Sequence, residues 1–537
     1  MHTETEAYNS DVTIIGAGPV GLTIANIIGA TGLKVILLDQ LDKLIDYPRG
    51  VGLDDEALRV FQAIGLADDV AKHITPYHWV RIYNAKRKLI TTVEPRHMPF
   101  GWSKRNAFHQ PLADKALYDG LARFPNVRVL FGHNVEHIQD DDQSVTIQGQ
   151  TSAGESFNLV SRYLVGSDGG RSITRKHIGA SFEGTTKPEP FLVIDLANDP
   201  IGRPNLEFVC DSKLPYVSIA LPHGVRRFEF GVPKDQVLDD FDVSDEFVAR
   251  NLNRIKPGIS TKNIIRRRVY YHSARLASKF RSGRVILAGD AARLMPVWQG
   301  QGYNSGIRDA MNVAWKLVFV LKGISKDALI DSYHAERWQN SKDMIAVSVL
   351  MGKIFNPGPK LLCLLRDWAF GVLKFFPKAR QYVTTMSWKP IPKFSKGVIV
   401  EAPDERTDNP IGQLFIQPSV SDADGQKHRL DDLVGMNFSV ISWGYNPDDY
   451  IDSAANKVLE KLSATRIVVL PQCQAEPDKT RAGTFNVIYD DGALKDWFDL
   501  RRGSVVVLRP DKVVAAICEA SNISETIHRL ADRLSLA

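Results

Sequence analysis

The sequence has few cysteines and little net charge. Its 537 residues include four cysteines (Cys210, Cys363, Cys473 and Cys518), which form neither a CxxC pair nor a zinc-binding spacing. We therefore expect no metal site, and separate, reduced cysteines favour a cytoplasmic protein. The 67 basic and 62 acidic residues leave a net charge of +5. This charge is too dilute for the basic surface of a nucleic-acid-binding protein, so no nucleic-acid partner is expected.

Long apolar segments are scarce as well. Residues 12–33 carry no charge and are long enough to span a membrane, but five glycines and Pro19 interrupt them. A buried strand, a turn and a helix explain this segment better. Residues 361–376 could lie on a membrane surface, although we expect a helix packed between domains. The N-terminus lacks the basic segment and small-residue cleavage site of a signal peptide, and no membrane association is expected.

The residues that are present indicate a folded protein of several domains. Apolar residues make up 44% of the chain and charged residues 24%, which excludes disorder, collagen and coiled coil. Residues 12–15 and 35–38 read as buried strands on either side of a helix that ends near Ala30. This βαβ unit predicts a parallel sheet with a right-handed crossover.

Later segments predict further units. Alternating apolar and polar residues over 191–232 indicate an antiparallel sheet inserted into the α/β domain, with strands at 206–210, 215–221 and 227–232. Residues 284–288 are again mostly apolar and predict another buried strand of the parallel sheet. Five prolines between 357 and 392 indicate a helical linker. A new α/β unit begins near Glu401, with expected strands at 438–442, 466–470, 484–489, 504–508 and 513–518.

The first motif is Gly16-Ala-Gly18-Pro-Val-Gly21, between a strand and a helix. Gly16 permits a tight turn, Gly18 lets a pyrophosphate approach the backbone, and Gly21 lets the helix pack closely on the sheet. The helix N-terminus offers free amides to the phosphates. Asp39 ends the next strand, 18 residues after the last glycine, where a carboxylate can accept hydrogen bonds from a ribose. Together these features predict a dinucleotide-binding site.

Two later motifs favour FAD over a nicotinamide dinucleotide as the bound cofactor. Asp168-Gly169 and Gly289-Asp290 each follow an apolar strand, and a second carboxylate at a strand end can bind a ribityl hydroxyl, which only flavins have. Either acid alone could be a surface residue at a strand end. Residues 296–304 then form a glycine-rich turn into a helix, whose N-terminal amides can stabilise negative charge on a reduced flavin ring.

On these three motifs, residues 10–345 resemble the single-component FAD-dependent aromatic hydroxylases, the class A flavoprotein monooxygenases. The resemblance implies these cofactor-binding residues: Gly16, Gly18, Pro19, Val20, Gly21, Asp39, Gln40, Arg49, Gln110, Asp168, Gly289, Asp290, Pro296, Gly300, Gly302, Tyr303 and Asn304. It places Arg49 beside the pyrophosphate and Gln110 near the ribityl chain, although either could be an ordinary polar contact. It assigns Asp168 to both FAD binding and flavin reduction.

Within that family, the chain is most similar to the 3-(3-hydroxyphenyl)propionate hydroxylase and phenol hydroxylase branch. The similarity rests on the segments 288–292, 300–302, 304–309 and 312–316 and on the extra C-terminal domain. The chain departs from the pattern at Arg293, where a histidine is usual, and at Val297, where a second proline is frequent. Trp298 replaces a smaller residue that commonly faces the substrate. These changes lie beside the flavin and leave the aromatic substrate open.

The resemblance implies an NAD(P)H- and O2-dependent hydroxylation of a phenolic ring through a flavin C4a-hydroperoxide, in aromatic catabolism. NADH or NADPH and O2 are then co-substrates, and a small aromatic molecule is the ligand. A phenol needs a base to become nucleophilic, and the sequence does not identify that base. The substrate-pocket candidates are Val297, Trp298, Arg227, Tyr216 and His272.

Other readings of the same fold remain. A flavin-dependent halogenase would need a Trp-x-Trp-x-Ile-Pro segment, which none of the nine tryptophans forms. A non-hydroxylating FAD oxidoreductase is a further alternative. Another is a non-catalytic flavoprotein, against which the complete set of flavin motifs argues.

The expected fold is α/β, with a GxGxxG-type, Rossmann-like FAD-binding domain, an inserted antiparallel substrate sheet and a C-terminal domain that resembles thioredoxin. Because residues 443–447 read Trp-Gly-Tyr-Asn-Pro, that last domain lacks CxxC and is expected to be structural or to form a homodimer. The expected boundaries are 10–80, 104–182 and 276–345 for the FAD-binding domain, 81–103 and 183–275 for the substrate sheet, 346–400 for the helical linker and 401–537 for the C-terminal domain.

Overall fold

The first βαβ unit has the predicted form. The computed structural model describes residues 9–211, 215–238, 242–355, 359–373, 375–387, 392–401, 409–471, 486–490 and 492–537. Strand β1 (Ser10–Ile15) leads into α1 (Pro19–Gly29), and β2 (Val35–Leu38) returns parallel to β1. Both strands and α1 are almost wholly buried, which explains their continuous apolar sequences.

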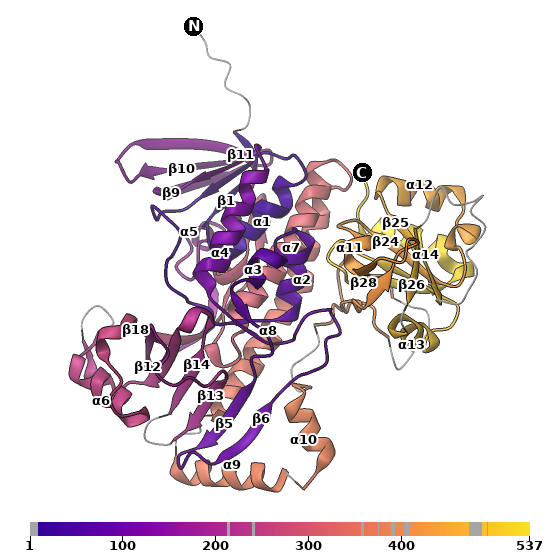
Figure 1. Cartoon of the computed structure of the whole chain (residues 1–537). Helices are drawn as coiled ribbons and strands as arrows, with labels where there is room; N and C mark the ends of the chain where they lie inside the picture. The colour runs from indigo at the N-terminus through magenta and orange to yellow at the C-terminus, as the bar shows by residue number, and fades with distance from the viewer. Residues whose placement is uncertain are drawn as a thin grey trace.

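Residues far apart in sequence complete the first sheet. Its strand order is β19-β20-β11-β1-β2-β8, and the hairpin β9–β10 extends it from β11 (Figure 1). The predicted strand near residue 285 is confirmed as β20, which lies parallel to β11. The bounds are β8 (Val127–Leu130), β9 (His133–Asp140), β10 (Val145–Thr151), β11 (Ser156–Gly166), β19 (Arg281–Ser282) and β20 (Val285–Leu287).

Helices cover this sheet, and three short strands of the same part of the chain form a small sheet of their own. The long helix α7 (Gln301–Leu321) packs closely against α1, because Gly306 of α7 leaves room for Val20. The remaining elements are α2 (Asp55–Ala63), α3 (Ala67–Ala71), α4 (Gln110–Asp119), α5 (Ile173–His177), β3 (Gly52–Leu53), β4 (Ile74–Thr75) and β7 (Asn106–Phe108).

The second sheet has the order β21-β18-β12-β15-β14-β13-β5-β6, and all its pairs are antiparallel except β13–β5. The predicted antiparallel insertion is therefore confirmed, with one parallel pair. Helix α6 (Asp245–Ile255) packs on it through Phe247, Val248 and Leu252. The strands are β5 (Val80–Asn84), β6 (Leu89–Val93), β12 (Phe182–Leu196), β13 (Leu206–Cys210), β14 (Tyr216–Ala220), β15 (Arg226–Gly231), β18 (Ile264–Ala277) and β21 (Arg293–Leu294).

Helix α8 (Asp331–Phe355) runs from the predicted FAD-binding domain into the predicted linker, which contains α9 (Lys360–Leu373) and α10 (Pro377–Thr384). The expectation that residues 361–376 pack between domains is wrong. Helix α9 lies beside β6 at the end of the second sheet (Figure 1), and Leu361 and Trp368 are 67% and 70% exposed. In the described ranges, no helix combines the length and the apolar character needed to cross a membrane.

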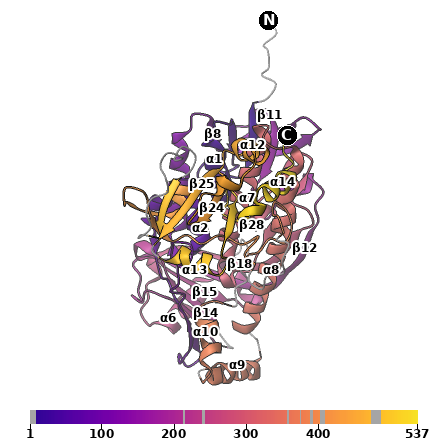
Figure 2. The same ribbon diagram turned by 90° about the vertical axis from the view of Figure 1, so that its right-hand side faces the viewer.

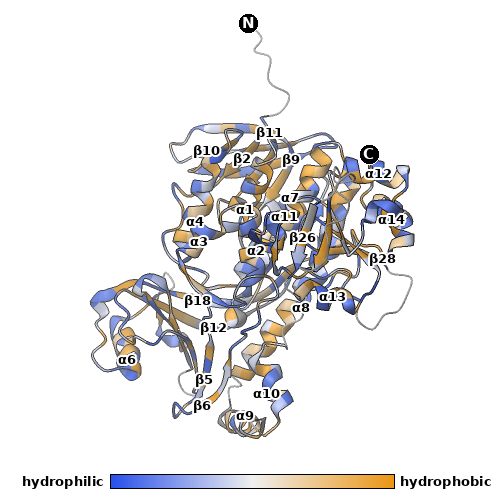
Figure 3. Cartoon of the chain, turned by 45° about the vertical axis from the view of Figure 1, so that its right-hand side comes forward, coloured by the Kyte–Doolittle hydropathy of each residue, from blue (hydrophilic) through white to orange (hydrophobic). Residues whose placement is uncertain are grey.

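The C-terminal unit is a mixed sheet flanked by short helices. Its strand order is β23-β22-β26-β25-β24-β27-β28, in which β24, β25 and β26 are parallel. Figure 2 shows β24, β25 and β28 in this unit. Hydrophobic residues concentrate on the central strands and hydrophilic ones along α14 (Figure 3). The bounds are β22 (Ser419–Ser421), β23 (Lys427–Arg429), β24 (Ser439–Trp443), β25 (Thr465–Pro471), β26 (Asn486–Asp490), β27 (Ser504–Leu508), β28 (Val514–Glu519), α11 (Leu430–Val434), α12 (Ser453–Lys461), α13 (Ala493–Asp499) and α14 (Ile523–Arg533).

The strand predicted at 484–489 begins outside the described residues, and Cys473 lies outside them as well. Cys210, Cys363 and Cys518 are free, the first two buried. The likeness to thioredoxin stays a prediction.

Candidate functional site

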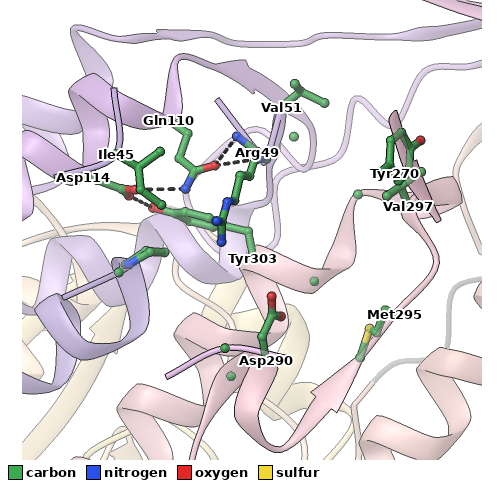
Figure 4. Close-up of a pocket in the computed structure, with 18 of the residues that line it drawn as sticks. Ile45, Arg49, Val51, Gln110, Asp114, Tyr270, Asp290, Met295, Val297 and Tyr303 are labelled. Carbon is green, nitrogen blue, oxygen red and sulfur yellow. Dashed lines mark hydrogen bonds between the residues drawn. The ribbon is translucent and has the colours of Figure 1, made fainter. Parts of the chain in front are cut away.

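A large cavity lies between the first sheet and the second. Its volume is about 1850 Å³, its open mouth included. Gly18, Asp39 and Asp290 line one end, while His272 and Trp298 line the other. Figure 4 shows side chains from both ends, with Arg49 near Asp290, and Tyr270 beside Val297. The cavity thus joins the predicted cofactor loop to an aromatic pocket.

The three glycines of the first motif are required for different structural reasons. A Cβ on Gly16 (φ +104°) would lie 2.4 Å from the Ser167 carbonyl oxygen, and one on Gly21 would lie 2.1 Å from the Gly16 oxygen. Both glycines therefore permit close backbone packing. A Cβ on Gly18 would meet nothing within 4 Å, and Gly18 lines the cavity just before α1. Only Gly18 of the three leaves open space for a ligand.

The acidic residues at this end fit a cofactor with ribose and ribityl hydroxyls. Asp39 accepts a hydrogen bond from the Ala17 amide (2.8 Å) and lines the cavity. Asp290 stands exposed in the cavity wall, and no described residue donates a hydrogen bond to its carboxylate. The enclosing protein raises the pKa of Asp290 by desolvation. An unpartnered carboxylate facing open space is suited to a ligand hydroxyl.

A buried cluster orders the loop that carries Arg49. Gln110, the first residue of α4, accepts hydrogen bonds from the amides of Arg49 (2.9 Å) and Gly50 (2.5 Å), as Figure 4 shows. It donates to Asp114 (2.9 Å), which also accepts from the Tyr303 hydroxyl (3.1 Å). Burial raises the pKa of Asp114 to about 7. Sequence reasoning missed Asp114, although its spacing of four residues from Gln110 on a helix was a usable signal.

The start of α7 is fixed by polar contacts. Gly300 (φ +64°) precedes the helix and lines the cavity together with Gly302 and Tyr303. The buried Asn304 side chain accepts from the Asp54 amide (3.0 Å) and donates to the Gly300 carbonyl (2.8 Å). The first residues of α7 therefore line the cavity end where the sequence predicts the flavin.

The Asp168-Gly169 and Gly289-Asp290 motifs lie at the same end of the cavity, where Gly169 and Gly289 line it. Asp168 accepts hydrogen bonds from the Thr174 amide and hydroxyl (3.0 Å each), and its second carboxylate oxygen is buried without a partner among the described residues. Gly289 lines the cavity and packs on Val20, where a Cβ would lie 2.8 Å from a Val20 methyl.

Aromatic side chains form the other end of the cavity. The His272 ring stacks on Trp298 (centroids 5.1 Å apart) and meets Phe191 edge-on (4.4 Å). Neither His272 nitrogen has a hydrogen-bond partner in the described chain, and burial lowers the pKa of His272 to about 4. The imidazole is therefore neutral at pH 7. Val297 lines the cavity and is 43% exposed.

Three further polar residues that the sequence did not indicate line this end: His78, Arg105 and Glu229. Tyr270, which the sequence places on a strand near the substrate sheet but does not identify as the base, lines it too. The Tyr270 hydroxyl donates to Glu229 (3.2 Å), and burial raises the pKa of Glu229 while Arg227 opposes the shift. Strand periodicity identifies such residues only as one face of a sheet. It does not show which face of the sheet borders the cavity.

Some predicted site residues lie outside the cavity wall. Arg227 is buried against Asp195 (2.7 Å) and donates to the Pro48 carbonyl (2.5 Å), and the Tyr216 hydroxyl accepts from Arg87 (2.6 Å). The Gln40 side chain is exposed to solvent. The other predicted residues that do not line the cavity are Gly16, Gly21, Asp168, Pro296 and Asn304.

Comparison with known proteins agrees with this geometry. Residues 9–348 match the FAD binding domain family, and residues 412–533 match the HcaD C-terminal domain family. The 3-(3-hydroxy-phenyl)propionate/3-hydroxycinnamic acid hydroxylase of Comamonas testosteroni is 41% identical over 569 residues, covering 97% of this chain and 96% of that protein. The protein of the same name from Mycolicibacterium gilvum is 44% identical, with 97% and 91% covered.

Solved structures share the fold over nearly the whole chain. The flavin-dependent monooxygenase PieE, solved with FAD and substrate, superposes with a TM-score of 0.78 at 19% identity, covering 98% of this chain and 99% of that one. Aklavinone-11 hydroxylase gives a TM-score of 0.77 at 20% identity, with 98% and 100% covered. The loop at Gly18, the carboxylate of Asp290 and the aromatic pocket beyond them thus occur in a chain that belongs to the family of FAD-dependent aromatic hydroxylases, in the branch of the 3-(3-hydroxyphenyl)propionate hydroxylases.

Proposed function

We propose that this enzyme hydroxylates the ring of a 3-hydroxyphenyl-substituted propionate or cinnamate, as the names of its relatives state for them. One observation carries the proposal: a continuous cavity connects the cofactor loop to a pocket whose walls are aromatic rings and a Tyr270–Glu229 pair. A phenol ring packs well on an indole or imidazole face, and its hydroxyl needs a proton acceptor.

The residues at the Gly18 end would hold FAD. Gly18 and the first amides of α1 suit the pyrophosphate, Asp39 the adenosine ribose, and Asp290 the ribityl chain. Bound FAD supplies the redox chemistry by which NADH or NADPH activates O2. Gln110 positions the backbone of Arg49 and Gly50 at this end, so its contribution is to hold the loop.

The Tyr270–Glu229 pair is suited to moving the phenol proton. The Tyr270 oxygen can accept the proton of the substrate hydroxyl while its own proton passes to Glu229, to which it already donates. Because burial raises the pKa of Glu229, its carboxylate is more basic than an exposed one. The neutral His272, stacked on Trp298, positions the ring beside this pair.

The test is product formation by the purified holoenzyme. NADH and NADPH oxidation, hydroxylated product and hydrogen peroxide would be measured with 3-(3-hydroxyphenyl)propionate, phenol and 3-phenylpropionate. We expect hydroxylated product only from the phenols, with a product-to-NAD(P)H ratio near one for the propionate. NAD(P)H oxidation that yields only peroxide with every phenol would exclude a hydroxylase.

Two variants test the proposed relay. Tyr270→Phe and Glu229→Gln should slow hydroxylation by roughly 100-fold, the usual contribution of a positioned acid or base. Flavin reduction by NAD(P)H should be unaffected, because neither residue lies at the cofactor end. Hydroxylation at the wild-type rate in both variants would remove the pair from the mechanism.

We also infer the remaining organisation. The domain boundaries proposed from the sequence are supported by the way in which β20 joins the first sheet and β5–β6 join the second.

The C-terminal unit is proposed as a thioredoxin-like structural module that contributes to a homodimer, and its residues 443–447 hold no cysteine. Free, largely buried cysteines support a cytoplasmic location. Sedimentation velocity would test the dimer.

A further inference from the structure

An arginine without a counter-ion stands in the wall of the aromatic end. Arg105 lies just before β7 and lines both the large cavity and a neighbouring one of about 1400 Å³. Its Nε is buried with no hydrogen-bond partner, and no carboxylate of the described chain forms an ion pair with it. Burial lowers the pKa of Arg105 to about 10, so the guanidinium is still charged at pH 7.

The neighbouring groups do not neutralise this charge. His78, whose backbone amide donates to the Arg105 carbonyl (2.9 Å), lines the same cavity and is 3% exposed, with its Nε2 unpartnered in the described chain. Burial and the charge of Arg105 lower the pKa of His78 to about 3, so this imidazole is neutral. The carboxylates of the cavity have other partners or another place: Glu229 accepts from Tyr270, Asp114 accepts from Gln110, and Asp290 lies at the cofactor end.

The remaining wall of this end is apolar. Leu206, Phe208, Val217 and Ile219, from β13 and β14, line the cavity together with Arg105 and Tyr270. The pocket therefore presents one uncompensated positive charge and one proton-accepting pair on an otherwise apolar surface. Arg105 is half-buried, and leaving its guanidinium in this wall without a partner is costly, which indicates that a ligand supplies the missing anion.

We propose that Arg105 binds the carboxylate of the substrate, while the phenol hydroxyl lies at Tyr270. This inference rests on the proposed function, because it names the group by which a hydroxyphenyl propionate or cinnamate is recognised. Arg49, the other arginine that lines the cavity, lies beside Asp114 and Asp290 (Figure 4) and serves the cofactor end. A charge-assisted contact at Arg105 holds the carboxylate end of the substrate while Tyr270 holds the hydroxyl, and together they decide which ring carbon faces the cofactor end.

The experiment compares an acid with its neutral amide. The dissociation constants of 3-(3-hydroxyphenyl)propionate and 3-(3-hydroxyphenyl)propanamide would be measured on the oxidised holoenzyme by flavin absorbance and by calorimetry. We expect the wild type to bind the acid roughly 10- to 100-fold more tightly than the amide, the range of a hydrogen-bonded charge. Arg105→Met should abolish that preference and leave the amide affinity unchanged.

Two further variants make the result specific. Arg105→Lys keeps the charge without the planar fork and should retain part of the preference. Lys104→Met removes the neighbouring cation, which lines only the second cavity, and should keep the wild-type preference. The flavin content of each variant reports whether it has folded, and Arg105→Lys provides the test if Arg105→Met loses flavin.

The outcomes separate the two proposals. An Arg105→Met or Arg105→Lys holoenzyme that keeps the full preference for the acid would overturn the role of Arg105. A wild type that binds and hydroxylates the acid and the amide equally would also overturn it, while the proposed hydroxylation stands. If the wild type prefers the acid through Arg105 but hydroxylates no phenol, the proposed function fails and the anion site remains.

Discussion

Single buried side chains decide how the cofactor end is held. Asp114 is 5% exposed and accepts hydrogen bonds from Gln110 and Tyr303, so it ties α4 to the start of α7. Burial raises its pKa to about 7. At the aromatic end, the ring of Trp298 contacts the rings of both His272 and Phe208.

The raised pKa of Asp114 predicts a pH dependence of stability. Unfolding lets the carboxyl ionise near its ordinary value of 3.8, whereas the folded protein keeps it protonated up to about pH 7. The stabilisation is complete below pH 3.8 and is lost as the pH rises through 7. Between pH 5 and pH 8 we expect the flavin-free protein to lose about 3 kcal/mol of unfolding free energy relative to Asp114→Asn.

Urea denaturation at a series of pH values checks this prediction. The control is Asp119→Asn, which changes an exposed carboxylate of the same helix that pairs with Lys115. This control should keep the wild-type pH dependence. An Asp114→Asn protein with that same dependence would contradict the assigned protonation.

Trp298 is expected to orient the aromatic substrate. Trp298→Ala should enlarge the pocket and let the ring move away from the reacting oxygen, which it must approach within about 3–3.5 Å. NAD(P)H consumption should continue while hydroxylated product falls and hydrogen peroxide rises. Trp368→Ala, 70% exposed on α9, should keep the wild-type product-to-NAD(P)H ratio. An unchanged ratio in Trp298→Ala would show that Trp298 is not a pocket wall.

Contacts between whole elements place these residues. The chain around Pro48–Gly50 is held from two sides, by Gln110 of α4 and by Arg227 of β15. Helix α8 supports the turn that carries Trp298: Ser348 donates to the Pro296 carbonyl (2.7 Å), and Gly352 leaves room for the Trp298 ring. Elements from both sheets therefore meet at the cavity.

Removal of Arg227 should loosen the cofactor loop from a distance. In Arg227→Gln, Asp195 stays buried without its partner and the Pro48 carbonyl loses a donor. We expect a loss of about 3–5 kcal/mol in unfolding free energy and weaker FAD binding, measured by denaturation and by flavin release. Arg87→Gln on the same sheet should cost less than about 1 kcal/mol, because its partner Glu207 also pairs with Arg203. Equal losses in the two variants would show that Arg227 has no special role.

At the scale of the whole molecule, buried charges join the C-terminal unit to the FAD-binding unit. Glu336 of α8 accepts from Lys316 of α7 (2.7 Å) and from Arg509 of the C-terminal unit (2.7 Å). Arg59 pairs with Asp431 across the same interface (2.5 Å). Burial would raise the pKa of Glu336, but Arg509 and Lys316 lower it to about 2. The carboxylate is thus charged throughout the neutral range.

Glu336→Gln should weaken this interface. The charges of Arg509 and Lys316 would lose their shared carboxylate, and we expect a loss of about 3–5 kcal/mol in unfolding free energy without loss of FAD at low temperature. Asp331→Asn, at the exposed start of α8, should change stability by less than about 1 kcal/mol. Thermal denaturation followed by flavin fluorescence measures both. Two variants of equal stability would refute the role of the network.

The predictions made from the sequence succeeded where the signal is local. The strand–turn–helix at Gly16–Gly21 and the strand ends at Asp39 and Asp290 are local patterns, and each lies at one edge of the first sheet. The outer surface of α9 was predicted wrongly, because amphipathic character does not show which neighbour covers a helix.

By itself, the sequence determined the FAD-binding unit, the family and the inserted sheet, because glycine spacing and strand periodicity express the backbone conformation that each segment adopts. The tertiary structure alone decided which side chains line the aromatic end. His78, Arg105 and Glu229 come from separate segments and meet only when the second sheet folds over the first. Their roles depend on burial and on the absence or presence of a partner, and these are properties of the packed chain, which no local pattern encodes.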